Sequence, residues 1–298
     1  MKKGYHDLLR PELISTVSGL ALISRVIVDG FLSGLNHSKR VGHGMEFSQF
    51  RSYQPGDDLR LLDWKMLARS GRYYIKQAEV ETNISIKFIL DSSKSMLHEE
   101  DGLSKMDFVR VLVASLSYLA HQQGDAVGLF SVNDAQLRSL FPKVQKQHFN
   151  RLLHELIEIE NEGKWPSGST SLNELHDRTH KELLFFITDL HEHDAELLDF
   201  IKSLKTARNE VVVFHIMGKN ELEFDYKGNV TFEDLETGTK LKVNAPEAKT
   251  KYLELLNLSL SEVKNSLLAK DINYHLFRTD VHMGEALQYF LKKRSKLL

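Results

Sequence analysis

The spacing of hydrophobic positions divides the chain into three parts. Between Leu13 and Leu35, apolar residues recur mostly at steps of three and four, which predicts an amphipathic helix. From about residue 36 to 72 the sequence is rich in Gly, His and charged residues and has no helical period, so we expect an ordered loop or short strands. From residue 73 onward, apolar runs of strand length alternate with segments of helical period.

The third part predicts strands and helices in alternation. Strands are expected at 84–90, 126–130, 183–188, 211–217 and 272–277, with a hairpin formed by Val132 and 136–141. Helices are expected at 104–121, 146–158, 171–181, 194–207, 246–270 and 283–293. The run from Leu183 to Ile187 is apolar throughout, as a parallel strand buried on both faces requires. The pattern predicts an α/β fold, a doubly wound and mostly parallel sheet with helices on both faces.

We predict one α/β domain over residues 81–298. Residues 1–80 are expected to form a helix and an extended segment packed on that domain. A polar segment at 218–245 interrupts the strand–helix pattern, and its alternating residues predict a small hairpin insertion that turns at Thr237 and Gly238.

Charge and composition narrow the function. Lys and Arg number 39 against 41 Asp and Glu, so no net basic field attracts nucleic acid. Cysteine is absent, which excludes thiol catalysis and zinc–thiolate sites and suits a reducing compartment. The helix at 13–35 carries Arg25 and Asp29 near its middle, each costing roughly 2.5–3.5 kcal/mol on membrane insertion. We therefore expect no stable membrane insertion and a cytoplasmic location.

Candidate chemistry begins where the strand at 84–90 ends. The segment Asp91-Ser92-Ser93-Lys94-Ser95 places one carboxylate and two alternate hydroxyls at the carboxyl end of that strand. Such oxygens are hard ligands suited to Mg²⁺ or Mn²⁺. A simpler interpretation is that Asp91 or Ser93 only caps the next helix.

Two further loops supply oxygens at the same sheet edge. Thr188 ends the strand at 183–188 and Asp189 follows it, and Thr170 lies in a hydroxyl-rich loop before a helix. With these residues the sequence resembles the von Willebrand factor type A domain and its metal-ion-dependent adhesion site. The resemblance assigns the metal ligands as Asp91, Ser93, Ser95, Thr170 and Asp189. It implies a divalent cation with an open position that a partner's carboxylate fills.

A second resemblance lies upstream. Residues 44–47, 51–60, 63–64 and 68–69, together with FEDLETG at 232–238, are similar to the signature of the bacterial domain of unknown function 58 family. This resemblance covers nearly the whole chain. Members of that family combine the motif with a von Willebrand type A-like domain. They frequently accompany MoxR-type AAA+ ATPases, so the resemblance implies such an ATPase as the partner.

The upstream motif has a structural and a functional interpretation. Its opposite charges would form a clasp that pins the extended segment to the domain. Alternatively, Arg51, Arg60 and Trp64 would bind an anion or a partner. The residues concerned are Arg51, Tyr53, Asp57, Asp58, Arg60, Asp63, Trp64 and Arg69.

These features favour a metal-dependent protein-interaction module over an enzyme. The alternative is a Mg²⁺-dependent phosphoester hydrolase with Asp91 and Asp189 as metal ligands. A transition-metal site at residues 191–194 is a weaker candidate, because a short turn before a helix explains the same residues. The sequence contains no G-x-S-x-G, P-loop or G-x-G-x-x-G motif, so serine-hydrolase, NTPase and dinucleotide-binding functions have no local support.

Overall fold

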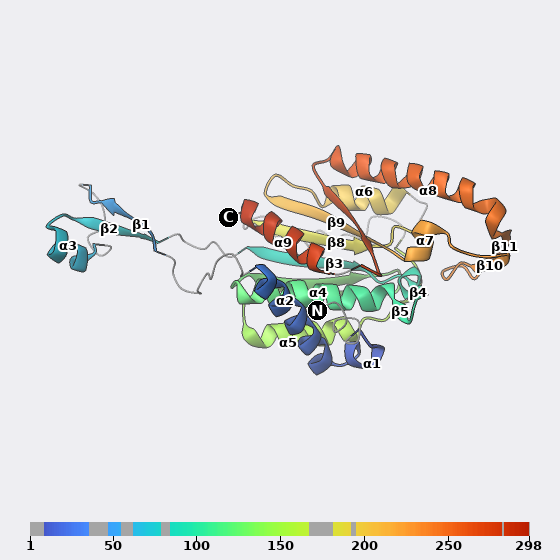
Figure 1. The fold of residues 1–298 in the computed structure, drawn as a ribbon, viewed down its shortest axis with the longest axis horizontal. Coiled ribbons are helices and arrows are strands. Elements are labelled where there is room, and N and C mark those ends of the chain that lie inside the picture. The colour runs from blue at the N-terminus through green and yellow to red at the C-terminus, as the bar shows by residue number, and fades with distance from the viewer. Residues whose placement is uncertain are drawn as a thin grey trace. The chain divides into compact units, whose positions relative to one another are not determined.

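The protein is described here by a computed structural model (Figure 1). The structure describes residues 9–35, 47–54, 62–78, 84–166, 181–191, 195–281 and 283–297. The chain divides into two compact units: residues 1–32 with 83–297, called the main unit, and residues 33–82, called the small unit. The expected division near residue 80 is therefore only one of two boundaries, because the N-terminal helix belongs to the main unit.

A six-stranded sheet forms the centre of the main unit. Its strands are β3 (Ser85–Asp91), β6 (Ala126–Val132), β7 (Leu137–Lys143), β8 (Glu182–Thr188), β9 (Asn209–Met217) and β12 (Asn273–Arg278). Their order is β12-β9-β8-β3-β6-β7, and every neighbouring pair is parallel except β6 and β7. All seven residues of β8 are buried, as its apolar sequence predicts. The sheet confirms the predicted α/β fold.

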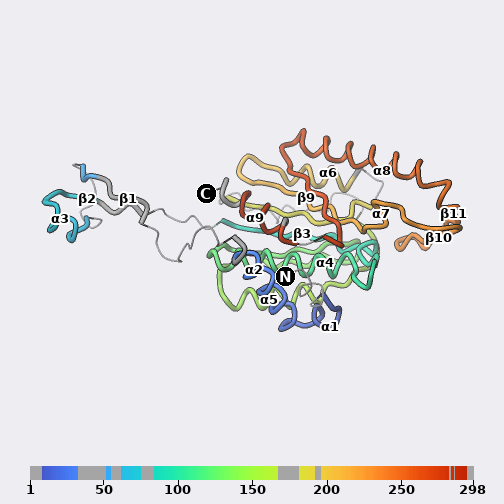
Figure 2. The backbone as a smooth tube through the Cα atoms, viewed as in Figure 1, coloured from blue at the N-terminus to red at the C-terminus, as the bar shows by residue number. Residues whose placement is uncertain are grey.

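Helices cover both faces of this sheet (Figure 1). One face packs against α1 (Pro11–Ile14), α2 (Val17–Leu35), α4 (Lys105–Gln122), α5 (Lys146–Ile157) and α9 (Gly284–Leu297). The other packs against α6 (Ala195–Ser203) and α8 (Ala245–Leu268), which Figure 2 shows running on the same side of the sheet. Strand β3 contributes side chains to the hydrophobic core on each face of the sheet. Phe88 and Leu90 lie in the core beside α4 and α5, and Ile89 lies in the core beside α6 and α8.

Two predicted helices differ from the structure, and a third cannot be compared with it. The helix expected from Leu13 to Leu35 is broken at residues 15–16, where the Thr16 hydroxyl accepts a hydrogen bond from the Gly19 amide at 3.1 Å. A hydroxyl that competes for helical amides favours such a break. The helix expected at 194–207 ends at Ser203. The helix expected at 171–181 lies outside the described residues.

The predicted hairpin insertion is present and follows a short helix, α7 (Lys219–Glu223). It consists of β10 (Asn229–Glu233) and β11 (Lys240–Asn244), which pair antiparallel. The Asp234 amide donates to the Thr239 carbonyl at 2.9 Å, and the Gly238 amide donates to the Asp234 carbonyl at 2.8 Å. Gly238 has φ +71°, which other residues rarely adopt.

The small unit contains a two-stranded sheet and one helix. Strand β1 (Phe47–Ser52) pairs antiparallel with β2 (Tyr74–Ala78). Between them lies α3 (Trp64–Ser70), where the sequence pattern predicted no helix. Across both units, none of the helices within the described residues combines the length and hydropathy needed to cross a membrane.

A pair of glycine substitutions tests the packing of the sheet edge. A Cβ on Gly128 in β6 would lie 2.8 Å from the Pro142 ring and 2.9 Å from the Leu140 carbonyl oxygen of β7. We expect Gly128→Ala to lower the free energy of unfolding by about 1–3 kcal/mol through overpacking. Gly30→Ala in α2 meets open space and should raise it by up to about 1 kcal/mol. Chemical denaturation measures both, and equal effects of the two changes would contradict this packing.

Candidate functional site

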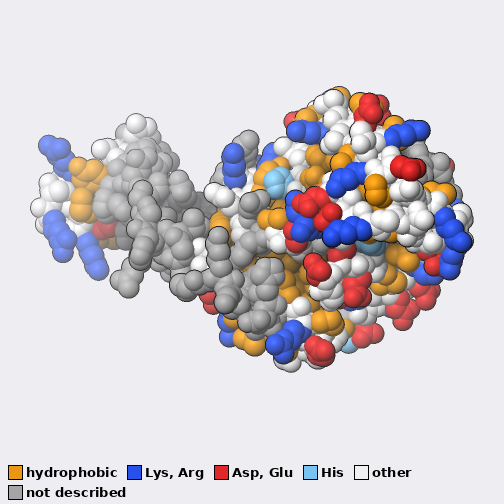
Figure 3. Space-filling model, turned by 45° about the vertical axis from the view of Figure 1, so that its right-hand side comes forward, with side chains coloured by type: hydrophobic (Ala, Val, Ile, Leu, Met, Phe, Trp, Pro, Cys, Tyr) orange, Lys and Arg blue, Asp and Glu red, His pale blue; other side chains and the backbone are white. Residues whose placement is uncertain are grey.

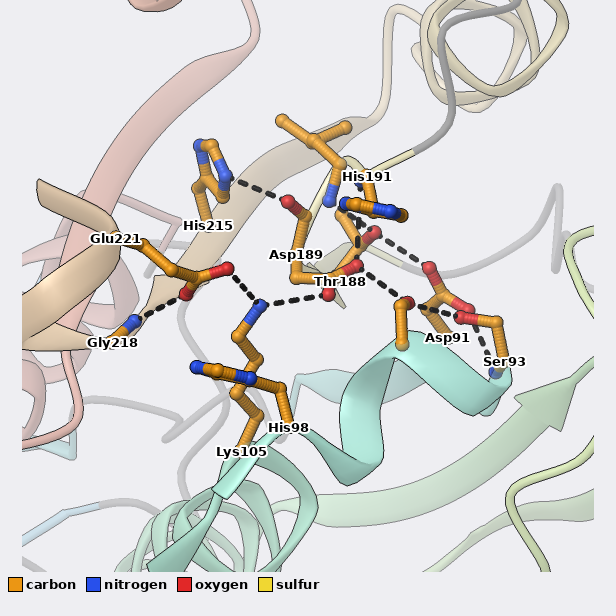
Figure 4. A network of polar contacts seen from close by, with 12 residues as sticks. Asp91, Ser93, His98, Lys105, Thr188, Asp189, His191, His215, Gly218 and Glu221 are labelled. Carbon is orange, nitrogen blue, oxygen red and sulfur yellow. Dashed lines mark hydrogen bonds and ion pairs between the residues drawn. The ribbon is translucent and has the colours of Figure 1, made fainter. Parts of the chain in front are cut away.

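The candidate site lies at the point where the chain stops adding strands on one side of β3 and begins adding them on the other. The chain leaves β3 toward β6 and later enters β8 on the other side of β3, and α/β folds commonly bind ligands beyond the carboxyl ends of the strands at such a switch point. Asp91 is the last residue of β3, and Asp189 directly follows β8. A single turn, η4 (Lys94–Leu97), carries Ser95 back toward them. Figure 4 shows the resulting network.

Four of the five predicted metal ligands come together in one hydrogen-bonded chain. The Asp91 carboxylate accepts from the Ser93 amide at 3.0 Å and from the Thr188 hydroxyl at 2.7 Å. The Ser93 and Ser95 hydroxyls are 2.9 Å apart, and Ser95 donates to Asp189 Oδ1 at 3.1 Å. Asp91, Ser93, Ser95 and Asp189 are at most 5% exposed. Thr170, the fifth, lies outside the described residues.

The helix-capping interpretation of Asp91 and Ser93 does not hold. Ser93 precedes η4 but its side chain makes no capping hydrogen bond. The next long helix, α4, is capped by Ser104, whose hydroxyl accepts from the Asp107 amide at 3.0 Å. The side chains of Asp91 and Ser93 therefore face the site instead of the helix.

Lys105 is a site residue that the sequence pattern did not indicate. Its ammonium donates to Asp189 Oδ2 at 2.9 Å and to Glu221 Oε1 at 2.8 Å, and its side chain is 3% exposed. Glu221 comes from α7, and its other oxygen accepts from the Gly218 amide at 2.6 Å. Figure 4 shows the lysine pointing between the two carboxylates. A cation at the first residue of a helix opposes the helix dipole, and these two carboxylates offset that cost.

The two aspartates differ in charge because their neighbours differ. Burial, with the nearby negative charge of Asp189, raises the pKa of Asp91 to about 6. Burial also disfavours the charged form of Asp189, but the Lys105 ammonium outweighs it and lowers the pKa of Asp189. Burial likewise opposes the charge of Lys105, yet Asp189 and Glu221 raise its pKa. At neutral pH the lysine and Asp189 form a charged pair, whereas burial and the charge of Asp189 disfavour the charge of Asp91 more than its two hydrogen bonds favour it.

His215 fixes the backbone of Asp189. Its Nε2 lies 2.9 Å from the Asp189 carbonyl oxygen, and its Nδ1 lies 2.7 Å from the Tyr274 hydroxyl. Burial lowers the pKa of His215 to about 4, so the ring is neutral at neutral pH. Because a carbonyl only accepts, Nε2 donates to Asp189 and Nδ1 accepts from Tyr274.

Glu236, in the turn of the β10–β11 hairpin, also reaches the site. Its Oε1 atom is buried and has no hydrogen-bond partner among the described residues. Its carboxylate has Ser95, Asp189 and His191 as polar neighbours, and burial, reinforced by the charge of Asp189, raises its pKa. A water molecule, a hydrogen-bond donor or a cation beside this oxygen would offset the cost of burying it.

The donor set fits a hard divalent cation. It consists of hydroxyl and carboxylate oxygens, including the unpartnered oxygen of Glu236, and such oxygens suit Mg²⁺ or Mn²⁺. Within the described ranges, no group of three or more His, Asp or Glu side chains is arranged to hold a metal. Neutral hydroxyls would therefore provide a large part of the coordination. The weaker transition-metal candidate at 191–194 falls mostly outside those ranges.

The upstream motif is described only in part. The Asp63 side chain caps α3, accepting from the Lys65 and Met66 amides at 2.8 and 3.0 Å. Trp64 is 64% exposed, which is unusual for a tryptophan with a purely structural role. The Tyr53 ring packs against Tyr73, and Arg69 is exposed. Asp57, Asp58, Arg60 and the Arg51 side chain lie outside the described residues, so the clasp stays a prediction.

Comparison with protein families gives one match that covers most of the chain. The model of the family described as "Protein of unknown function DUF58" matches residues 49–255. An uncharacterized protein of Mycobacterium tuberculosis is 23% identical over 237 residues, which are 78% of this chain and 74% of that protein. The uncharacterized protein YeaD of Bacillus subtilis is 29% identical over 116 residues, covering 38% of this chain and 26% of YeaD.

Several solved structures are similar to this chain. The conserved hypothetical protein BatB from Bacteroides thetaiotaomicron has a TM-score of 0.47 at 12% identity, covering 72% of this chain and 100% of that chain. A von Willebrand factor type A protein from Catenulispora acidiphila has a TM-score of 0.40 at 12% identity, covering 75% of this chain and 44% of that chain. The VWA domain of SpRpn10 has a TM-score of 0.39 at 11% identity, covering 70% and 95%.

Replacing Asp91 tests whether its buried negative charge destabilises the protein at neutral pH. The pKa of Asp91 is higher in the folded protein than in the unfolded chain, so its contribution to stability is present at acidic pH and is lost as the pH rises from about 4 to about 6. With EDTA at pH 7, Asp91→Asn should raise the free energy of unfolding by up to about 3 kcal/mol. The gain should disappear near pH 4. Asp199→Asn, at an exposed position, is the control. A gain independent of pH would contradict this explanation.

Removing the buried ammonium tests the ion-pair network. Lys105→Gln leaves two carboxylates without their cation and should lower the free energy of unfolding by about 3–5 kcal/mol. Glu221→Gln should cost less, because the Lys105–Asp189 pair remains. Lys202→Gln breaks only an exposed pair with Asp199 and should cost at most about 1 kcal/mol. Urea denaturation at pH 7 measures this ranking, and similar losses for Lys105 and Lys202 would refute it.

Proposed function

We propose that this chain, which belongs to the DUF58 family of proteins of unknown function, is a metal-dependent protein-interaction module. In this proposal the site beyond β3 and β8 holds Mg²⁺ or Mn²⁺ and, through it, a carboxylate of a partner protein. The observation that carries the proposal is the buried hydrogen-bonded chain from Ser93 through Ser95 to Asp189. It gathers hydroxyl and carboxylate oxygens at the strand ends where α/β folds commonly bind ligands.

The chain's own residues would divide the work at this site. Ser93 and Ser95 would hold the cation through neutral oxygens, with Thr170 as an expected third hydroxyl. Asp91 and Asp189 would orient these hydroxyls and balance the charge. When bound, the cation supplies a positive charge with an open coordination position. Lys105 occupies one oxygen of Asp189, so the site keeps less negative charge, and metal binding should be weak.

Binding suits the geometry better than hydrolysis does. Both carboxylate oxygens of Asp91 accept hydrogen bonds from the protein, and the residue is 3% exposed. A carboxylate held in this way is suited to positioning its neighbours and poorly placed for attack on a substrate, so a hydrolase at this site would use Asp91 only as a metal ligand. The Mg²⁺-dependent phosphoester hydrolase is therefore the second candidate, and it becomes an outcome of the experiment below.

The partner is proposed from family resemblance and surface chemistry. The resemblance of the upstream motif implies a MoxR-type AAA+ ATPase. Figure 3 shows acidic and basic side chains interspersed over the visible face of the main unit, so that face offers no extended basic patch for nucleic acid. A partner's Asp or Glu would be recognised at one point, through the cation.

Metal binding is the first test. We expect Mn²⁺ and Mg²⁺ to bind the wild-type protein at one site, measured by titration calorimetry, and Asp91→Ala to abolish the heat signal. Circular dichroism should show that this variant still folds. Asp199→Ala, at an exposed site on α6, should bind the cation normally. Unchanged affinity in Asp91→Ala would refute the metal site.

Partner binding is the second test. A MoxR-type ATPase captured on the tagged protein in Mg²⁺ should be released by EDTA and retained poorly by Ser93→Ala. Moderate salt should matter less, because screening weakens exposed ion pairs more than a buried metal bridge. Equal retention with EDTA would exclude the metal-bridged mechanism. Hydrolysis of a phosphoester in Mn²⁺ that disappears in Asp91→Ala would favour the enzyme instead.

A further inference from the structure

We propose that Glu236 supplies a carboxylate ligand to the cation in the isolated chain. The β10–β11 hairpin thereby fills the position that a partner's carboxylate would take. This inference rests on the proposed metal site and adds an internal occupant to it. A partner's carboxylate would then have to displace Glu236 from the cation before it could bind.

The first observation is the unpartnered oxygen of Glu236. Its Oε1 is buried without a hydrogen-bond partner in the described part of the chain, whereas Glu233 on the same hairpin pairs with Lys240 at 3.1 Å. A carboxylate oxygen that loses water and gains no donor is unfavourable. A cation bound beside it would remove that cost.

The second observation is the set of neighbours around this carboxylate. The Ser95 hydroxyl is a hydrogen-bonding neighbour, and Asp189 is a charged neighbour of the same sign. Ser95 in turn donates to Asp189, so Glu236 meets the end of the proposed ligand chain. A cation bound beside the buried Asp189 and the partly buried Glu236 would relieve the repulsion between their like charges. The nearby Lys105 ammonium is already shared by Asp189 and Glu221.

The third observation is that the turn holds Glu236 in place independently of any metal. The Glu236 amide donates to Asp234 Oδ1 at 2.8 Å, and the Thr237 hydroxyl donates to Asp234 Oδ2 at 2.6 Å. A ligand fixed in advance loses little conformational entropy when it binds.

The β10–β11 hairpin is structurally separate from the six-stranded sheet, even though its turn holds Glu236 in place. Strands β10 and β11 form a two-stranded sheet of their own and do not join the six-stranded sheet. Most of their side chains are exposed. Phe232 of β10 packs against Phe224 and Tyr226, which join the hairpin to the segment after α7. No residue of β10 or β11 belongs to the two buried clusters that cover the six-stranded sheet, so moving the turn would leave those clusters intact. An attached carboxylate has a high effective concentration, so removing it should weaken cation binding and favour an outside carboxylate.

Titration with Mn²⁺ alone tests this inference in the full chain. Glu236→Gln should weaken Mn²⁺ binding at least about fivefold, whereas the matched change Glu233→Gln should leave it unchanged. Hydrogen exchange supplies a second measurement. Mn²⁺ should slow amide exchange at residues 229–244 in the wild-type protein and in Glu233→Gln, and should not do so in Glu236→Gln.

The outcomes separate this inference from the proposed function. If Asp91→Ala abolishes Mn²⁺ binding but Glu236→Gln binds like wild type, the inference is wrong and the metal site stands. If Glu236→Gln weakens binding while exchange in the hairpin still slows, Glu236 acts only at a distance and direct ligation is excluded. If wild type and Asp91→Ala both fail to bind Mn²⁺, the metal site and this inference fail together.

Discussion

The buried ammonium of Lys105 is the interaction on which the site depends. It joins the start of α4 to the loop after β8 and to α7, which lie 84 and 116 residues further along the chain. Without it, Asp189 and Glu221 would have to keep their charges in a region with little water, which is costly. The same ammonium limits the site, because it holds one oxygen of Asp189 and leaves the other for Ser95. The ammonium thus stabilises the site, and under the proposed function it would also weaken metal binding there.

Asp189 is held through its backbone as well as its side chain. His215 donates to its carbonyl from β9, and Tyr274 on β12 donates to that histidine. This places the carboxylate by contacts from the two strands beyond β8, in sheet order. The Asp91 carboxylate is held differently, by hydrogen bonds from the Thr188 hydroxyl and the Ser93 amide. The two aspartates therefore have different tasks, although their positions at strand ends are alike.

The sheet, and the meeting of four predicted residues at its edge, could be predicted because both follow from the hydrophobic pattern along short stretches of the sequence. Long apolar runs become central strands, and residues after parallel strands meet at one edge, which brings Asp91 and Asp189 together. Lys105 could not be predicted, since a lysine at a helix start is usually solvated and its burial depends on two distant carboxylates. Glu236 lies in the FEDLETG segment, which the resemblance to the domain of unknown function 58 family singled out. That resemblance did not indicate that Glu236 lies close to Ser95 and Asp189. Helix α3 is short, but Asp63 and Gly71 are recognisable as its two caps.

The placement of α1 and α2, which carry the five residues named next, makes the small unit an insertion in the sequence and not an N-terminal appendage. Ile14, Leu20, Ile23, Ile27 and Val28 are at most 3% exposed in the core beneath the sheet. Burying five such side chains contributes roughly 8–15 kcal/mol, which is comparable to the whole stability of a typical domain. Dissection of this chain should therefore excise residues 33–82 internally and rejoin α2 to β3. Cutting at the apparent domain start would remove a helix that the remaining sheet needs as a cover, and leave an apolar surface prone to aggregation.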